Sequence, residues 1–138
     1  MPFTASTSQY PGLKLYLTEM KKYEPAYAQD EVAIQGWESA ALFAQGVKMA
    51  GNNLTQANVI KQINTLTDFT AGGLTTPTNW KTGHTGHAPP YCGAYIRAVG
   101  DKYVPALDTS KKSVFVCFGS TNANHPKPEA VPSGTPNG

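Results

Sequence analysis

The sequence has few charged side chains and no long apolar run, and each shortage argues against a class of protein. Charged residues make up 14% of its 138 residues, and the formal net charge of +2 is too small to indicate a nucleic-acid partner. No apolar run approaches the roughly 18 residues that a membrane-spanning helix needs. The opening residues MPFTASTSQY contain neither the basic nor the apolar segment of a signal peptide. The length of 138 residues predicts one folded domain.

Motifs typical of enzymes are also missing. The chain has no Gly-x-Ser-x-Gly nucleophile elbow, no phosphate-binding glycine loop and no cluster of carboxylates. Neither cysteine is accompanied by the His and acid pair that would activate it at a helix N-terminus. We therefore expect the protein not to be an enzyme and to need no cofactor.

The first half of the sequence predicts three helices. Residues 13–23 carry apolar side chains at helical spacing. Asp30 is placed to cap a long helix over 31–50, and Thr55 to cap a third helix over 56–66. The 31–50 segment is apolar around much of its circumference, which is typical of a buried helix.

The second half predicts a loop and then strands. Residues 67–90 are rich in Gly, Thr and Pro and are expected to form a long ordered loop. Residues 91–99 alternate as one strand, and Gly100-Asp101 forms a type II′ turn. The chain then returns through 102–107, and the β-branched and aromatic residues of 113–118 predict a further short strand.

The local fold class is therefore α+β, with three helices followed by a small antiparallel hairpin sheet. These elements occupy residues 1–118, and the Pro-, Gly- and Asn-rich residues 119–138 are expected to be a disordered tail. So small a sheet could not cover the apolar surface of the helices. Leaving several large side chains in water would cost several kcal/mol, at about 25 cal/mol per Å² of apolar surface. We therefore expect either association with copies of the same chain or membership of a larger fold.

The segment WKTGHTGHAPPYC, residues 80–92, raises the possibility of a metal site. His84, His87 and Cys92 could each be a ligand, but structural zinc sites usually pair their ligands in two knuckles. One histidine pair with a lone cysteine matches that pattern poorly. The favoured interpretation is that the histidines make local hydrogen bonds in a loop that leads into a strand, with no metal.

The two cysteines, Cys92 and Cys117, lie in separate predicted strands. A disulfide between them would fasten the last strand to the hairpin, and an exported protein would permit it. The alternative is two free, buried thiols.

One stretch of the sequence resembles a known family. QGWESAALFAQGVKMAGNNLTQANVIKQINTLTDFTAGGL is similar to the C-terminal region of type I periplasmic binding proteins, the branched-chain-amino-acid-type solute receptors of ABC transporters. That family opens a long helix with Gly-Tyr-Asp-Ala, continues with Ala-Gly and a capped helix, and then has Phe-x-x-Gly-Gly-Leu. Here Gly36 to Ala40 takes the first place, with Trp for Tyr, Glu for Asp and one additional residue. Ala50-Gly51 and Phe69 to Leu74 take the others. Residues 80–105 resemble the segment that closes the family's sequences.

The resemblance covers roughly residues 10–118 and implies two α/β lobes with a solute in the cleft between them. Such receptors are more than twice this length, so the chain is expected to be the C-terminal portion of the fold. The parent protein would bind an amino acid or similar small organic solute and present it to an ABC permease. It would be periplasmic or extracellular and tethered to the membrane. The alternative function is a truncated structural or interaction module that self-associates and binds no solute.

The resemblance also selects candidate ligand-binding residues at the start of the long helix. Trp37 and Glu38 lie in its helix-opening motif, at the edge of the implied cleft, and Gln35 directly precedes that motif. Trp37 could pack against the solute, and a polar neighbour could reach the solute or a bound water. The alternative is that Trp37 belongs to the core and that Glu38 is a solvated or hinge-pairing carboxylate.

Overall fold

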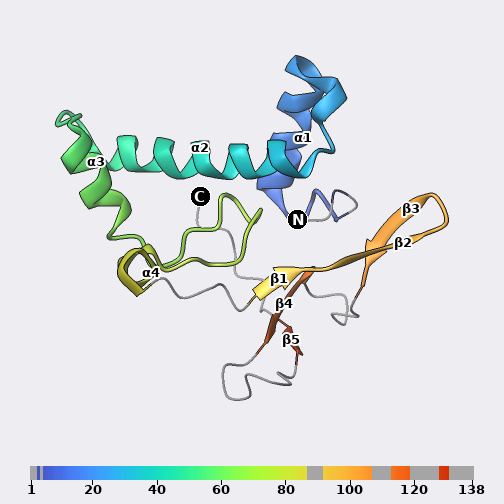
Figure 1. Cartoon of the computed structure of the whole chain (residues 1–138). Helices are drawn as coiled ribbons and strands as arrows, with labels where there is room; N and C mark the ends of the chain where they lie inside the picture. The colour runs from blue at the N-terminus through green and yellow to red at the C-terminus, as the bar shows by residue number, and fades with distance from the viewer. Residues whose placement is uncertain (1–2, 4, 87–91, 107–112, 119–127, 131–138) are drawn as a thin grey trace.

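The computed structural model describes residues 3, 5–86, 92–106, 113–118 and 128–130 (Figure 1). Its helices are α1 (Pro11–Tyr23), the short 3₁₀ helix η1 (Pro25–Tyr27), α2 (Glu31–Ala50), α3 (Gln56–Ile63) and α4 (Trp80–Gly86). Its strands are β1 (Cys92–Ala94), β2 (Ile96–Val99), β3 (Lys102–Pro105), β4 (Phe115–Phe118) and β5 (Pro128–Ala130). None of the helices in these ranges has the length and apolar character needed to cross a membrane.

The caps that the sequence predicts for two helices are confirmed. The Asp30 carboxylate accepts a hydrogen bond of 2.9 Å from the Ala33 backbone N–H at the start of α2. The Thr55 hydroxyl accepts one of 3.2 Å from the Asn58 N–H at the start of α3. Each bond satisfies a backbone donor that has no partner within its own helix. Helix α3 ends at Ile63, three residues earlier than the sequence predicted.

The expectation of one uninterrupted loop over 67–90 is wrong, because the described part of this segment contains α4. The Asn79 side-chain oxygen accepts a hydrogen bond of 3.2 Å from the Thr82 N–H, and the Asn79 carbonyl accepts one of 2.8 Å from Gly83. This cap starts a helical turn in spite of the glycines that follow. Before α4 the chain forms a closed loop, in which Phe69 and Thr78 exchange two backbone hydrogen bonds.

The strands form two separate antiparallel sheets. Strands β2 and β3 make the expected hairpin, with Val99 opposite Lys102 and Gly100 at a φ of 62° in the turn. The single strand expected over 91–99 is divided, however, because β1 pairs with β4 whereas β2 pairs with β3. Strand β5 adds to the other edge of β4, so these three residues of the expected disordered tail are ordered by pairing with an open strand edge. The remainder of that tail lies outside the described residues.

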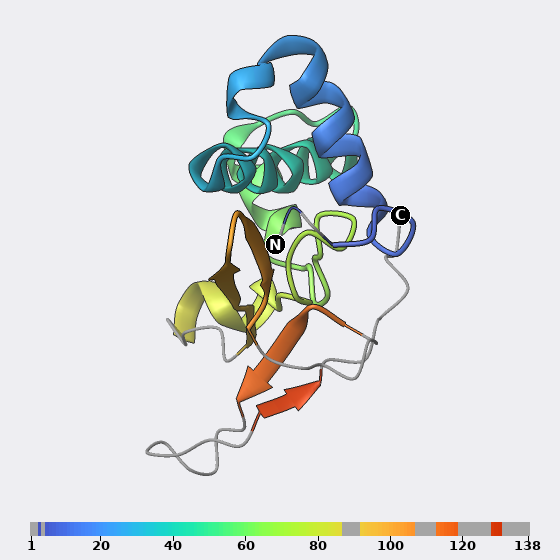
Figure 2. The same cartoon turned by 90° about the vertical axis from the view of Figure 1, so that its right-hand side faces the viewer.

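The main core lies where α1, the start of α2 and the loop after α3 meet β4. Its buried members are Tyr10, Leu13, Tyr16, Ile34, Leu74 and Phe115. The Tyr10 ring meets the Phe115 ring edge-on at 6.2 Å, and the Tyr10 hydroxyl accepts a 3.0 Å hydrogen bond from the Val114 N–H. These contacts join residues more than a hundred positions apart and attach the β1–β4–β5 sheet to the helices. Viewed as in Figure 2, α1, α2 and α3 lie on one side of the molecule and the strands on the other.

Helix α2 is largely uncovered in a single copy of the chain, as expected where so small a sheet cannot cover the apolar helices. It is a long rod with α1 near one end and α3 near the other (Figure 1), and its buried residues are only Ile34, Gly46 and Ala50. Val32 is 75% exposed and Phe43 is 62% exposed. Because the rest of the chain covers so little of this helix, much of its apolar surface faces solvent.

Candidate functional site

The loop between α3 and α4 faces α2 and is held in place by α1. The Gly12 N–H donates a hydrogen bond of 2.8 Å to the Gly72 carbonyl. Ala71, Gly72 and Gly73 all have positive φ, at 50°, 70° and 89°. This succession of left-handed residues folds the loop back on itself, so that Phe69 and Ala71 approach α2.

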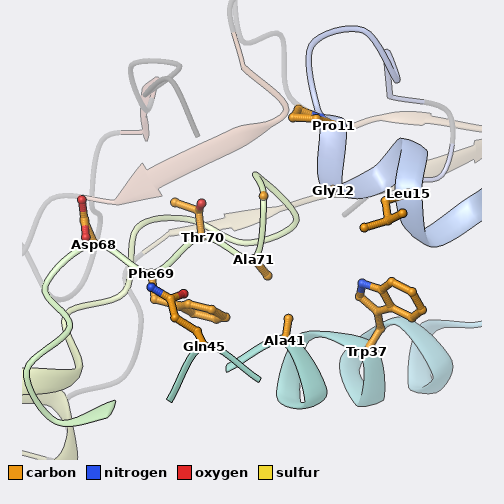
Figure 3. Close-up of a pocket in the computed structure, with 11 residues that line it drawn as sticks. Pro11, Gly12, Leu15, Trp37, Ala41, Gln45, Asp68, Phe69, Thr70 and Ala71 are labelled. Carbon is orange, nitrogen blue, oxygen red and sulfur yellow. The ribbon is translucent and has the colours of Figure 1, made fainter. Parts of the chain in front are cut away.

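The first hollow lies between α2, the start of α1 and this loop, with a volume of about 430 Å³. Figure 3 shows Trp37 and Leu15 at one end and Gln45 and Phe69 at the other, with Ala71 directed toward Ala41 between them. Its lining is mostly apolar. A hollow of this kind suits the apolar part of a small organic molecule.

Trp37 packs against the core and also lines the first hollow. Its ring lies edge-on to the buried Tyr16 ring, with the centroids 5.6 Å apart, and it packs against the core cluster. The same half-buried side chain lines the first hollow. Contact with the core restricts its motion, and this would keep its exposed part in position for a ligand.

The second hollow is smaller, about 300 Å³, and brings Gln35 and Glu38 together. The other side chains that line it come from α2, the loop and the start of α4: Ser39, Leu42, Phe69, Thr75, Thr78 and Trp80. Trp37 is not among them, so the three candidates divide between two hollows. Phe69 lines both, so the two hollows are adjacent.

Burial of Glu38 changes its acidity. Loss of contact with water disfavours the charged carboxylate, and this desolvation raises the pKa of Glu38 above its ordinary value of 4.5. A raised pKa shows that the surroundings do not fully compensate the negative charge. Partly desolvated carboxylates of this kind are often found at binding sites.

The effect of this carboxylate on stability can be tested. Because its pKa is raised on folding, the native state binds protons more tightly than the unfolded chain. Its contribution to the free energy of unfolding is fully present below pH 4.5 and is lost as the pH rises through the raised pKa. We expect Glu38→Gln to gain stability relative to the original chain between pH 4 and pH 7 in urea unfolding series.

The control for this measurement is Glu31→Gln, on the same helix. Glu31 is exposed in the first turn of α2, where a negative charge favours the helix. This variant is therefore expected to lose a little stability at neutral pH. A Glu38→Gln variant that behaved in the same way would contradict the prediction.

Two side chains of the second hollow were missed as candidates from the sequence. Trp80 lies at the start of α4, and its Nε1 is buried without a hydrogen-bond partner among the described residues. Phe69, a residue of the loop between α3 and α4, is buried. Phe69 had a signal in the sequence, since it opens the Phe-x-x-Gly-Gly-Leu motif. Trp80 was visible only as one aromatic residue of a segment expected to be a loop.

His84, the candidate metal ligand that the structure describes on α4, lines neither hollow. His84 is exposed on α4, and its Nδ1 contacts the Trp80 carbonyl one turn earlier. His87 lies outside the described residues. Among the residues that are described, no group of three or more His, Cys, Asp and Glu side chains is arranged to hold a metal ion.

Comparison with known proteins identifies the family. No curated protein and no solved structure matches the chain. A family model described as periplasmic binding protein matches residues 1–102. Such a match indicates solute binding for ABC transport and a periplasmic location, in a family that is typically non-enzymatic. Since the match covers well over half of the sequence, the chain belongs to the periplasmic binding protein family.

Proposed function

We propose that this chain forms the C-terminal part of a two-lobed solute receptor of the branched-chain-amino-acid type. The parent protein would bind an amino acid or similar small organic solute between its lobes and deliver it to an ABC permease. It would act in the periplasm or at the outer face of a membrane to which it is tethered. Binding would proceed by closure of the lobes about a hinge.

The observation that supports this proposal most strongly is the pair of adjacent hollows along α2. The first offers Trp37 and an apolar lining, and the second offers Glu38, Gln35 and several hydroxyl groups. An apolar pocket next to a few convergent polar groups is the usual arrangement of a small-molecule site. The helix-opening motif that suggested Gln35, Trp37 and Glu38 therefore lies where a solute could be held.

The chain alone would supply one wall of such a site. Micromolar binding corresponds to about −8 kcal/mol, and half of that free energy corresponds to about millimolar binding. If the second lobe supplies about half of the contacts, calorimetry on the isolated chain with branched-chain or aromatic amino acids should detect no micromolar binding. A micromolar response would contradict the proposal.

The decisive test is the coding sequence upstream of Met1. A contiguous first lobe preceded by a signal peptide supports the receptor. The product that includes this lobe should then bind an amino acid at micromolar concentration, and Trp37→Ala should weaken that binding at least tenfold. An in-frame stop codon directly upstream, or a complete product that binds none of these solutes, would reject it.

A second function, self-association without solute binding, is supported by a separate apolar groove. The groove lies between α2 and α3 and has a volume of about 490 Å³. It is lined by Phe43, Val47, Leu54, Thr55, Gln56, Val59, Ile60 and Ile63. Phe43, Leu54 and Ile60 are all exposed in a single copy of the chain. A second copy covering this surface would remove them from water.

We therefore expect the purified chain to have a mass in solution above the 14.7 kDa of one copy. Phe43→Ser should shift the mass measured by light scattering toward the monomer, because it removes an exposed ring from the groove. Val32→Ser is the matched control, since Val32 is exposed on the same helix but does not line the groove. A monomer at every concentration would contradict self-association.

We also propose that Cys92 and Cys117 form a disulfide. The register of β1 and β4 supports it, because these two residues lie directly opposite each other. Opposed residues of antiparallel strands have Cα atoms about 4.5–5.5 Å apart, within the range that a disulfide spans. Protein purified under oxidising conditions should have no titratable thiol after unfolding, and two after reduction. Two thiols before reduction would show that the bond is absent.

A further inference from the structure

We propose that the β2–β3 hairpin of one copy of the chain occupies the groove between α2 and α3 of a second copy. This inference rests on the self-association proposed above and names the part of the partner that fills the groove. Three observations carry it: both surfaces are exposed, they lie at opposite ends of the molecule, and neither the groove lining nor one face of the hairpin presents a charged side chain.

The hairpin is an exposed two-stranded ribbon. Among the described residues its strands pair only with each other. All four residues of β2 are exposed, and Tyr103 of β3 is 61% exposed. A two-stranded hairpin is at best marginally stable in water, and packing against a further surface stabilises it. The hairpin therefore has surface available for a partner and would be stabilised by one.

The residues Ile96, Ala98 and Tyr103 make up what we call the uncharged hairpin face. Residues two apart in a strand lie on the same face, and so do residues directly opposite each other. Ile96 and Ala98 therefore share a face with Tyr103, which is opposite Ala98. Arg97 and Val99 lie on the other face of β2. The hairpin can thus pack through the uncharged face without burying the Arg97 guanidinium.

The groove has a matching lining. None of its eight side chains is ionisable, and six are aliphatic or aromatic. The uncharged hairpin face can enter it without the cost of removing a charge from water. A second groove pressed against this concave surface would leave a void, whereas a projecting ribbon can fill it and cover the exposed side chains of Phe43, Leu54 and Ile60. Thr55 and Gln56 of the lining would provide hydrogen-bond partners for the Tyr103 hydroxyl.

The hairpin and the groove can meet only between copies. Figure 1 shows α3 at one end of the molecule and the hairpin at the other. Helix α2, which separates them, has 20 residues and is about 30 Å long at 1.5 Å per residue. The hairpin therefore cannot reach the groove of its own copy. Each copy offers one hairpin and one groove to its neighbours.

The first test measures the mass of the 138-residue chain by light scattering over a series of concentrations. Ile96→Thr keeps a β-branched side chain but places a hydroxyl on the uncharged hairpin face. We expect it to weaken association about tenfold, since the hydroxyl would enter an apolar groove. Val99→Thr is the matched control, because it makes the same kind of change in the same strand on the opposite face. It should associate as the original chain does.

The second test mixes two variants. Phe43→Ser damages the groove and keeps the hairpin, whereas Ile96→Thr damages the hairpin and keeps the groove. Each variant alone should be monomeric at a concentration at which the original chain associates. An equimolar mixture should recover a species of about twice 14.7 kDa, because the intact hairpin of one variant meets the intact groove of the other. Circular dichroism spectra that match that of the original chain establish that both variants are folded.

Failure of this inference can be distinguished from failure of self-association. If Phe43→Ser weakened association and Ile96→Thr did not, the groove would be an interface but the hairpin would not occupy it. Equal effects of Ile96→Thr and Val99→Thr, or a mixture of variants that stayed monomeric, would likewise overturn the inference. An original chain that was monomeric at every concentration would reject self-association as well.

Discussion

Replacing Tyr16 with alanine is expected to lower the free energy of unfolding by about 3–5 kcal/mol, the range for removing a large buried aromatic side chain. Tyr16 is 0% exposed. Its ring is stacked on Phe3 at 6.3 Å and meets Trp37 edge-on, and its hydroxyl donates a 3.3 Å hydrogen bond to the Tyr27 carbonyl. Truncation would leave a cavity where α1, η1 and α2 meet. Urea unfolding followed by circular dichroism measures the loss.

Two variants control for this result. Tyr16→Phe keeps the ring and removes the hydroxyl, so it should cost only about 0.5–1.5 kcal/mol, the net contribution of one hydrogen bond. Tyr23→Ala removes the same side chain from the end of α1, where it is 65% exposed, and should change stability by less than about 0.5 kcal/mol. If Tyr16→Ala cost no more than Tyr23→Ala, Tyr16 would not be part of a packed core.

Replacing Gly12 with alanine should destabilise the protein by about 1–3 kcal/mol, although alanine is the better helix former. A Cβ atom at this position would collide with the Ala71 carbonyl oxygen and lie 2.8 Å from the Gly72 carbonyl oxygen. Both obstacles are backbone, so they cannot move aside by a side-chain rotation. The substitution would push the loop away from α1 and disturb the first hollow.

Gly36→Ala is the matched control, because Gly36 also lies in a helix but a Cβ added there would meet no atom within 4 Å. At Gly36 no clash opposes the greater helix preference of alanine, so the substitution should stabilise the protein by about 0.5–1 kcal/mol. Chemical unfolding of both variants gives the comparison. We expect Gly12→Ala to lower the free energy of unfolding and Gly36→Ala to raise it. If both substitutions raised it, α1 and the loop would not be in contact.

The features that the sequence predicted well depend on neighbouring residues. The caps at Asp30 and Thr55 join atoms three residues apart, and the Gly100-Asp101 turn is fixed by its own two residues and the strands beside it. Family membership was likewise recognised from motifs in order along the chain, and it is confirmed by the family match. The branched-chain specificity and the C-terminal position within the fold stay proposals.

The features that the sequence did not predict depend on distant contacts or on a single capping side chain. Helix α4 was missed because its start depends on the Asn79 amide, in a segment dominated by glycine and threonine. The division of the expected strand into β1 and β2 depends on pairing of β1 with β4, which follows some twenty residues later. No local pattern encodes that choice of partner.

In the candidate site, too, some features follow from neighbouring residues and others depend on contacts between distant parts of the chain. Gln35 and Glu38, candidates at the helix-opening motif and directly before it, line one hollow because residues three apart share a helix face. The position of the loop determines that Trp37 lines a different hollow and that Trp80 lines the same hollow as Glu38. The loop is placed by the contact between Gly12 and Gly72, sixty residues apart in the chain.

Helix α2 contacts the rest of the protein near each of its two ends, and this determines how the effects of mutations at the two ends combine. Ile34 belongs to the cluster around α1, whereas Gly46 lies against Val59 and Ile63 of α3. At 1.5 Å per residue these two positions are about 18 Å apart along the helix. Because they share no neighbour, damage at one end should be additive with damage at the other. Helix α2 therefore fixes the position of one group of contacts relative to the other, although the two groups contribute independently to the free energy of unfolding.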